Sequence, residues 1–194
     1  MRRTLKNRLA LSTVVTTLII LVISVLLAGV VSYFAINVTS TRVQEESVHI
    51  TKHHVWHDGA NRALASLMII NTGGRDLVID KISVRGQECD WNSSTTDKFV
   101  NFVRTTDTIS ADLDYVESFA RNGSSTEVNI DGATYNFTVA TDDLILKSGY
   151  TMLIYIENPD SISINDIGLT VSIEIFTAQA MYYRESNVQA ITNN

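Results

Sequence analysis

The chain has 194 residues, with 21 acidic and 15 basic side chains and a formal net charge of −6. Four basic residues and no acidic ones lie in the first ten positions, so removal of that segment would leave 11 basic and 21 acidic side chains, a formal charge of −10. Such a surface excludes general nucleic-acid binding, which needs Lys and Arg to neutralise phosphates. The single cysteine, Cys89, excludes an internal disulfide framework, and we expect it to be a small buried apolar residue.

The first predicted element is an apolar run from Leu9 to Ile36 that contains no charged residue. A cleaved secretory signal has an apolar region of only about 7–15 residues, whereas a membrane-spanning helix needs about 20. The run therefore predicts a membrane anchor. The basic residues before it predict that the N-terminus stays in the cytoplasm and that the rest is exported. These leader charges are Arg2, Arg3, Lys6 and Arg8.

The run differs from a simple anchor at both ends. It starts with "ALSTVVTT", where small hydroxyl side chains favour close contact between helices in apolar surroundings. Beyond Ile36, no proline or glycine occurs until Gly59, a plausible C-terminal stop. We therefore expect one helix from Leu11 to about Trp56, roughly 70 Å long at 1.5 Å per residue, in a segment that covers residues 11–58.

The stretch "NRLALSTVVTTLIILVISVLLAGVVSYF" resembles the N-terminus of archaeal type IV pilins, the group that includes archaellins. Those precursors carry a short basic leader (a class III signal peptide), then a small residue at the processing site and an uninterrupted apolar helix. By position, the resemblance implies that prepilin peptidase cuts between Ala10 and Leu11, so that residues 1–10 form a cleaved leader. Two positions depart from the pattern. Leu9 stands where a basic residue often precedes the small one, and Val15 stands where bacterial pilins carry a glutamate that archaeal members commonly lack.

The resemblance also implies how the helix is used. In the precursor it would hold the protein in the membrane. After processing, a pilus assembly platform and its ATPase would transfer the helices of many copies into the core of a filament. The positions that would allow close helix packing are Ser12, Thr13, Thr16, Thr17, Ser24 and Gly29.

From Ala60 onward the pattern becomes extended, and we expect a β domain over residues 60–194. Leu64–Ile70 and Leu77–Val84 are predicted strands joined by "NTGG". The segments "TYNFTVAT", "YTMLIYIEN" and "IGLTVSIEIF" predict three more strands, and the last alternates with the period of a half-buried sheet. The polar stretch 90–125 predicts loops around one or two weak strands or a short helix.

Strands at this spacing, with no helices between them, favour an antiparallel β-sandwich of immunoglobulin-like type. The predicted fold class is therefore α+β, a long N-terminal hydrophobic helix followed by an antiparallel β-sandwich. The strand–"NTGG"–strand pattern also resembles the β-sandwich domains of archaellins and archaeal pilins.

All four histidines lie within nine residues of one another. On the expected helix, His49, His53 and His57 would lie near one face, where imidazoles can share a metal ion. A structural site needs four ligands, so a solvated or inter-subunit helix surface is the simpler interpretation. A pH-sensitive contact is a third alternative, because histidine changes charge near neutral pH.

Four Asn-X-Ser/Thr sequons occur in a chain that is expected to be exported. The motif is short and often arises by chance, but four of them predict at least one glycan, which would shield the outer surface. The candidate asparagines are Asn37, Asn92, Asn122 and Asn136.

No catalytic motif is evident in the sequence. It contains no Ser-His-Asp set, phosphate loop or paired-Cys metal motif, and we expect neither an enzyme nor a cofactor. The acidic residues do not reproduce a Ca²⁺-binding loop, so a solvated acidic surface is expected. The acids considered are Asp107, Asp112, Asp114, Glu117, Asp142 and Asp143.

The sequence thus predicts a structural subunit of an extracellular, type IV pilus-like filament used for adhesion or motility, between which it does not discriminate. The partners implied are further copies of the same chain, prepilin peptidase and the assembly platform. Two alternatives stay open. One is a permanently anchored surface protein whose β domain binds a ligand, and the other is a minor pilin of a secretion or DNA-uptake machine.

Overall fold

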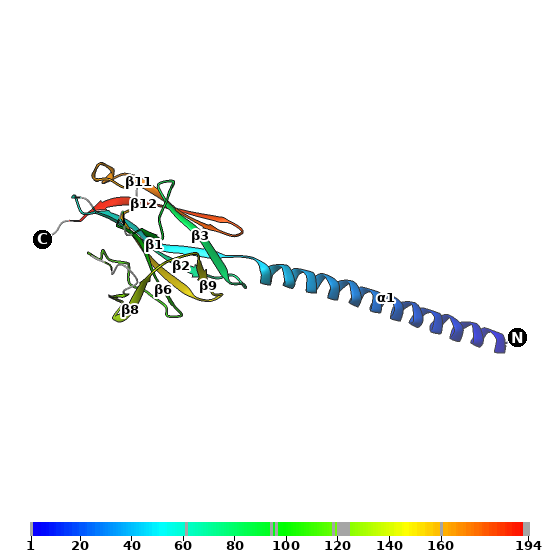
Figure 1. Ribbon diagram of the computed structural model, residues 1–194. Coiled ribbons are helices and arrows are strands. Elements are labelled where there is room, and N and C mark those ends of the chain that lie inside the picture. The colour runs from blue at the N-terminus through cyan, green and yellow to red at the C-terminus, as the bar shows by residue number, and fades with distance from the viewer. Residues whose placement is uncertain are drawn as a thin grey trace. The chain divides into compact units, whose positions relative to one another are not determined.

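The computed structural model describes residues 2–60, 62–93, 95, 97–117, 119, 125–159 and 161–191, and the side chains of residues 2–11 and 42–44 lie outside the description. The chain divides after Gln44 into a helical unit and a β domain that starts at Glu45. Figure 1 shows a single helix in the first unit and mainly strands in the second.

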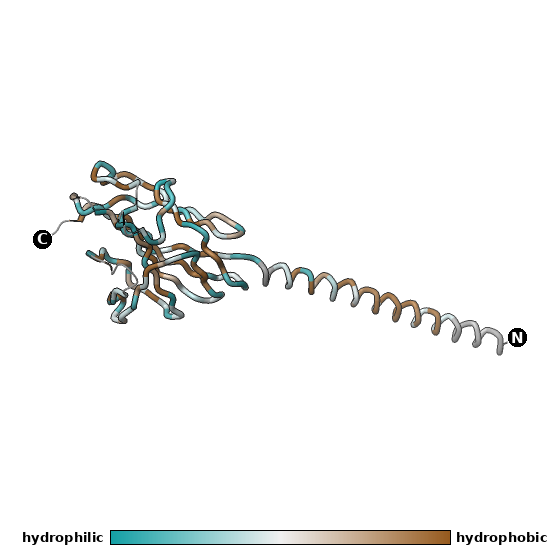
Figure 2. Tube along the Cα trace, viewed as in Figure 1, coloured by the Kyte–Doolittle hydropathy of each residue, from teal (hydrophilic) through white to brown (hydrophobic). Residues whose placement is uncertain are grey.

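The first unit is the helix α1 (Arg2–Gln44). It contains no proline and only one glycine, Gly29, so no residue removes a backbone hydrogen-bond donor from its interior. Ser12–Thr41 is a 30-residue stretch of this helix that is long and apolar enough to cross a membrane. Figure 2 shows this apolar stretch along α1.

The C-terminal end of α1 lies earlier than the sequence predicted. The expected helix to about Trp56, and with it the expected boundary at residue 58, is wrong, because Val48–His57 forms the strand β1. Half of the residues in "VHITKHHVWH" are β-branched or aromatic types that favour strands. Burial of Val55 and Trp56 in the β domain therefore decides their conformation. The β domain starts at Glu45 rather than at Ala60.

Within the described residues, the β domain forms a 12-stranded sheet in the order β4-β3-β11-β12-β1-β2-β10-β6-β8-β7, with β5 beside β6 and β9 beside β3. The described strand pairs are antiparallel apart from β1 and β12, which are parallel. The other bounds are β2 (Ala63–Asn71), β3 (Leu77–Val84), β4 (Gln87–Glu88), β5 (Asn92–Ser93), β6 (Lys98–Thr105), β7 (Ser125–Ile130), β8 (Ala133–Val139), β9 (Leu144–Leu146), β10 (Thr151–Glu157), β11 (Thr170–Thr177) and β12 (Met181–Ala190), with a short 3₁₀ helix η1 (Ile164–Asp166) before β11.

The central strand β2 is buried on both faces. Successive side chains of a strand point to opposite faces, and in β2 Ala65, Leu67 and Ile69 join one core cluster while Leu64 and Met68 join another. This arrangement explains why "ALASLMII" is an almost continuous apolar run rather than an alternating one.

The two halves of the sheet share the first of these cores. Ile79 of β3 and Ile173 of β11 pack in the same cluster as Leu67 of β2 and Ile154 of β10, although the two pairs of strands lie in different halves of the strand order. The sheet therefore folds over so that both halves contribute to one apolar interior. The predicted burial of Cys89 is confirmed, since it is 7% exposed in this cluster.

A β-bulge divides β1 into two segments. Thr51 pairs with Met68 and His54 with Ser66, so two residues of β1, Lys52 and His53, oppose a single residue of β2. Lys52 adopts a φ of +50° at this point. An extra residue reverses the alternation of side chains along a strand. In a regular strand, side chains on the same face are an even number of residues apart. In β1 the bulge places Ile50 and Val55 on the same face, although they are five residues apart.

The coarse fold class is confirmed, as an apolar N-terminal helix precedes a large, mostly antiparallel sheet. The five predicted strands correspond to β2, β3, β8, β10 and β11, and β3 has the predicted bounds Leu77–Val84. The two strands on either side of "NTGG" do not pair with each other, because β2 pairs with β1 and β10 whereas β3 pairs with β4, β9 and β11.

Candidate functional site

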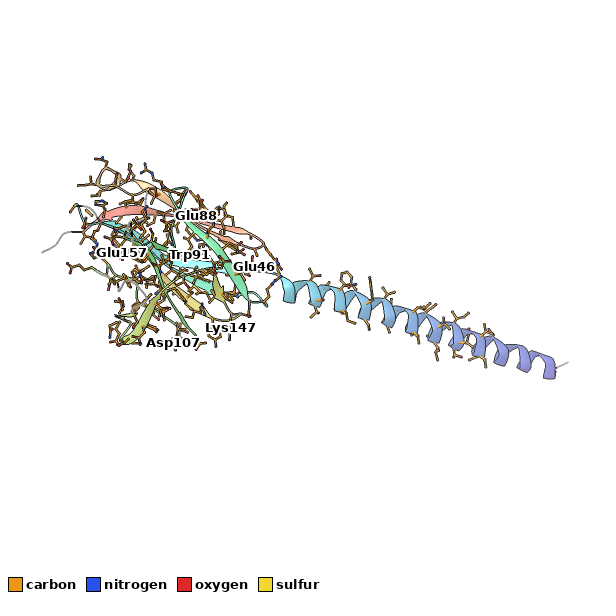
Figure 3. The ribbon with its side chains drawn as sticks, viewed as in Figure 1. Glu46, Glu88, Trp91, Asp107, Lys147 and Glu157 are labelled. Carbon is orange, nitrogen blue, oxygen red and sulfur yellow. The ribbon has the colours of Figure 1, made fainter. Side chains whose placement is uncertain are left out.

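The most extensive candidate surface is that of α1. Every side chain from Ser12 to Thr41 is exposed, and the large apolar ones are between 45% and 71% exposed. Consecutive helical residues are rotated by about 100°, so the four exposed side chains of Leu18–Leu21 are spread around the whole circumference. Figure 3 shows side chains projecting on all sides of α1. A helix that is apolar all round requires lipid or other helices around it.

Several hydroxyl groups of α1 donate hydrogen bonds to carbonyls of the helix itself. Thr16 Oγ1 donates to the Ser12 carbonyl at 2.9 Å, and Ser24 Oγ donates to the Ile20 carbonyl at 2.7 Å. Thr17 Oγ1 donates to the Val14 carbonyl at 2.9 Å. Such bonds remove the cost of placing a hydroxyl in an apolar environment. At Gly29 an added Cβ would meet nothing within 4 Å, so this position offers open space for a neighbouring helix.

The predicted processing site falls inside α1. The backbone is helical at Ala10 and Leu11. Their side chains, and those of the leader charges, lie outside the described residues. Processing therefore stays a prediction from the sequence.

The histidines lie on the strand β1 and not on a helix, so the expected shared helical face is wrong. His49 is exposed, whereas His57 is only 4% exposed and accepts a hydrogen bond at Nδ1 from the Gly59 backbone N–H at 3.0 Å. His53 Nε2 lies 2.9 Å from the Glu185 carbonyl oxygen of β12. These three side chains do not meet at a common point. Among the described residues, no group of three or more His, Cys, Asp or Glu side chains could hold a metal ion.

His54 contacts an acidic strap, which we define as residues 106–117 between β6 and β7. Its Nε2 lies 2.9 Å from Asp112 Oδ1, and its ring stacks on Trp56 at 5.2 Å. Partial burial alone would raise the pKa of Asp112, but the hydrogen bonds from His54 and the Leu113 backbone N–H, with the charge of Lys52, hold that pKa below its usual value. Asp112 is thus favoured as a carboxylate in the folded protein.

The acidic strap is fixed to the sheet by apolar and polar contacts together. Ile109 and Leu113 are buried in the second core, and Tyr155 donates a hydrogen bond to the Asp114 carbonyl at 2.9 Å. An open hollow of about 460 Å³ lies between the strap and β1, lined by Lys52, His53, His54, Ser110 and Asp112. Lys52 Nζ already donates to the Ala111 carbonyl. Lys52, His53, His54 and Asp112 therefore each already have a hydrogen-bond partner in the protein.

The acids weighed as Ca²⁺ ligands are separated in the structure. Asp107 Oδ2 accepts from Thr105 Oγ1 at 2.8 Å and from the Tyr135 hydroxyl at 3.3 Å. Asp142 Oδ1 accepts from the Asp143 backbone N–H at 2.9 Å. These carboxylates stabilise local turns instead of converging on one point.

The candidate glycosylation sites fall in different environments. Asn136 is exposed on β8 and Asn92 is exposed on β5, although Ser94 of the second sequon lies outside the described residues. Asn37 lies on α1 within the apolar stretch. Asn122 lies outside the described residues. Among the described asparagines, Asn92 and Asn136 are therefore the two that an oligosaccharyltransferase would meet on the surface of the β domain.

One set of contacts was not predicted from the sequence, namely those at the start of the β domain. The segment Asn71–Gly73, which we call the clasp, binds the residues that follow α1. The backbone N–H groups of Thr72 and Gly73 both donate to the Ser47 carbonyl, at 2.9 and 3.1 Å. Figure 3 labels Glu46 in this region. The "NTGG" motif predicts a turn. It does not predict that the turn binds Ser47, because Ser47 lies 25 residues before Thr72 in the chain.

Comparison with models of known protein families and with curated proteins gives no match for this chain. The main evidence for its function is therefore the exposed apolar surface of α1.

Proposed function

We propose that this protein is a pilin, a structural subunit of an extracellular type IV pilus-like filament of the archaeal kind. The uncleaved chain is anchored in the membrane through α1, with the β domain outside the cell. After prepilin peptidase removes residues 1–10, an assembly platform with its ATPase moves the helix out of the lipid. The helices of many copies then pack in the filament core, and the β domains cover it.

The observation that carries the proposal is the surface of α1. A 30-residue apolar segment, Ser12–Thr41, has no side chain buried within the protein. At 1.5 Å per residue it is about 45 Å long, whereas the apolar core of a bilayer is about 30 Å thick. An ordinary single anchor does not need this excess length. A helix bundle buries all of it, at about 25 cal/mol for each Å² kept from water.

The polar groups of α1 are compatible with both environments. The hydroxyls of Thr16 and Ser24 bond to their own helix, so these two donors stay satisfied on transfer from lipid to a protein core. Small side chains and Gly29 permit close helix contact. This combination supports a helix that resides first in lipid and later among its own copies.

The β domain supplies the outer layer of the proposed filament. We propose that its folded-over sheet is an immunoglobulin-like sandwich and that glycans at Asn92 or Asn136 add to its hydration. Copies would associate head to tail, since a heterologous contact that does not close generates a helical polymer. Adhesion or motility follows from such a filament at the cell surface.

Substitution of Ala10 tests the proposal in cells. Ala10→Phe places a bulky side chain at the peptide bond that the peptidase must accommodate, so we expect uncleaved chain in the membrane and no filaments by electron microscopy. Thr4→Phe is the matched control, because it adds the same ring within the leader but away from the junction, and we expect normal processing. Normal filaments from the Ala10→Phe variant would refute the proposal.

The same experiment identifies the alternatives. A permanently anchored surface protein would be full-length and membrane-bound in the wild type as well as in both variants. A minor pilin would be processed normally but would form a small fraction of the filaments sheared from cells.

A further inference from the structure

The chain enters the β domain through a fixed segment rather than a free linker. Ser47 accepts two backbone hydrogen bonds from the clasp, and its hydroxyl lies 2.9 Å from Thr72 Oγ1. One residue earlier, Glu46 Oε2 accepts a hydrogen bond from Thr177 Oγ1 at 2.7 Å. Residues 46 and 47 are therefore held by two different parts of the β domain, the C-terminal end of β11 and the clasp.

Gly73 is required by the close approach of the two segments. A Cβ at this position would lie 2.8 Å from the Ser47 backbone nitrogen and 2.9 Å from the Glu45 carbonyl oxygen. Those atoms belong to the main chain and have little freedom to move. Asn71 is the first residue of the clasp, is only 1% exposed and fixes the shape of the clasp. Its Nδ2 donates to the Arg75 and Leu146 carbonyls, and its Oδ1 accepts from the Gly73 backbone N–H.

The strand β1 continues from this fixed point through the centre of the sheet. It pairs with β2 from Val48 to His57 on one side. On the other side it pairs in parallel with β12, where His57 lies beside Ala190. The clasp is at one end of β1, and the C-terminal end of β12 is at the other.

Side chains close the seam where the backbones of β1 and β12 are not paired. Arg184 Nε donates to the Ile50 carbonyl at 3.2 Å, and Ser186 Oγ donates to the His53 carbonyl at 3.4 Å. His53 Nε2 contacts the Glu185 carbonyl. The carbonyls exposed by the bulge thus have partners on β12, and β1 is held on both sides along its length.

We propose that β1, fixed at its N-terminal end by the clasp, is a shear clamp that carries tension between α1 and the far end of the β domain. A pull that separates Gln44 from Ala190 acts along β1 and β12 in opposite directions. Ladder hydrogen bonds lie across the strands, so such a pull strains the three register pairs of β1 with β12 and the side-chain bonds of the seam together. The eight register pairs with β2 hold β1 in place on its other side. A pull on both strands from the clasp end would instead break the pairs one after another.

Force spectroscopy on the uncleaved full chain in detergent micelles tests this proposal. Handles are attached through Thr41→Cys and either Ala190→Cys or Gln179→Cys, all at exposed positions, while native Cys89 is buried. The Ala190 pair loads β1 and β12 in shear, and the Gln179 pair pulls from the clasp end. We expect a several-fold higher unfolding force for the Ala190 pair. Equal forces in the two directions would overturn the proposal.

Variants of the clasp give a second, independent reading. Thr72→Val keeps the shape of the side chain but removes the hydroxyl that contacts Ser47, and Gly73→Ala introduces the backbone clash. Both are expected to lower the force for the Ala190 pair. Thr170→Val is the matched control, because it removes a hydroxyl bonded to Asn187 away from the clasp. Wild-type force in both clasp variants would overturn the proposal, whatever the outcome for processing at Ala10.

Discussion

The helix α1 and the strand β2 contain similar apolar sequences but bury them in different ways. "LIILVISVLL" in α1 and "ALASLMII" in β2 are both nearly continuous runs of apolar residues. In β2, Leu67 and Ile69 are fully buried, whereas in α1 the comparable side chains of Leu21 and Leu26 are 63% and 65% exposed. The apolar side chains of the strand are buried within the chain, whereas those of the helix need lipid or other protein around them to be buried.

This difference separates two roles within one short protein. The β domain has the contacts of an independently packed unit, with two cores on either side of β2. The described side chains of the helix, Ser12 to Thr41, are all exposed and belong to neither core. A lipid bilayer and a bundle of identical helices are the two environments that suit such a surface.

Truncation of one leucine in each region gives the largest expected difference. Leu67→Ala removes a fully buried side chain from the first core and should lower the free energy of unfolding of the β domain by about 2–5 kcal/mol. Leu21→Ala truncates a side chain of α1 that is 63% exposed and belongs to neither core, and it should leave that free energy unchanged. Urea unfolding followed by tryptophan fluorescence reports on the β domain alone, since both tryptophans, Trp56 and Trp91, lie in it.

The two variants also control for each other, because the same atoms are deleted. A loss of β-domain stability in Leu21→Ala would show that α1 packs on the β domain, and the comparison would fail. An unchanged stability in Leu67→Ala would contradict the double-sided burial of β2.

Acid is expected to affect the β domain by a smaller amount. The Ser163 backbone N–H donates to Asp166 Oδ2 at 2.8 Å, and this bond, with the neighbouring Arg85 guanidinium, lowers the pKa of Asp166. Asp112 and Asp131 also have lowered pKa values. The ordinary carboxyl pKa is near 3.8, and these folded-state values lie below it. Between the lowered values and 3.8, the folded state therefore binds fewer protons than the unfolded state. The stabilisation is fully present above that range and is lost within it.

Thermal unfolding at a series of pH values checks this expectation. The melting temperature of the β domain should fall as the pH drops below about 4. Asp166→Asn keeps a similar shape but carries no charge, so it should be less stable near neutral pH and should lose less on acidification. An acid dependence equal to that of the wild type would exclude Asp166 as a contributor.

The sequence predicted those parts of the fold in which local pattern and burial agree. In β11, Val171, Ile173 and Ile175 alternate with polar residues and are buried as expected. Leu169, which the same pattern placed on the buried face, precedes the strand and is 51% exposed. Prediction from the sequence failed for β1 because the bulge at Lys52 and His53 breaks the alternation of a strand, while the lack of proline and glycine before Gly59 favoured a continued helix. It also missed β12, in which only Ser186 and Val188 are buried and no apolar period exists.

Some features of the candidate site could also be predicted from the sequence, and others could not. The surface of α1 could be predicted, because an apolar run of that length has few possible environments. The contact of His54 with Asp112 joins residues 58 positions apart, and the clasp joins Ser47 to Thr72. Such pairs depend on the order of strands in the sheet, which cannot be inferred from residue spacing or composition in a single sequence.

The most direct test of the central claim is the mass of the mature N-terminal peptide in material sheared from the cell surface. If α1 is the core helix of a filament, the chain in that material begins at Leu11 and retains the apolar stretch to Thr41. An intact Met1, or a new N-terminus after Ile36, would contradict the account, because α1 would then be a permanent anchor or a discarded signal.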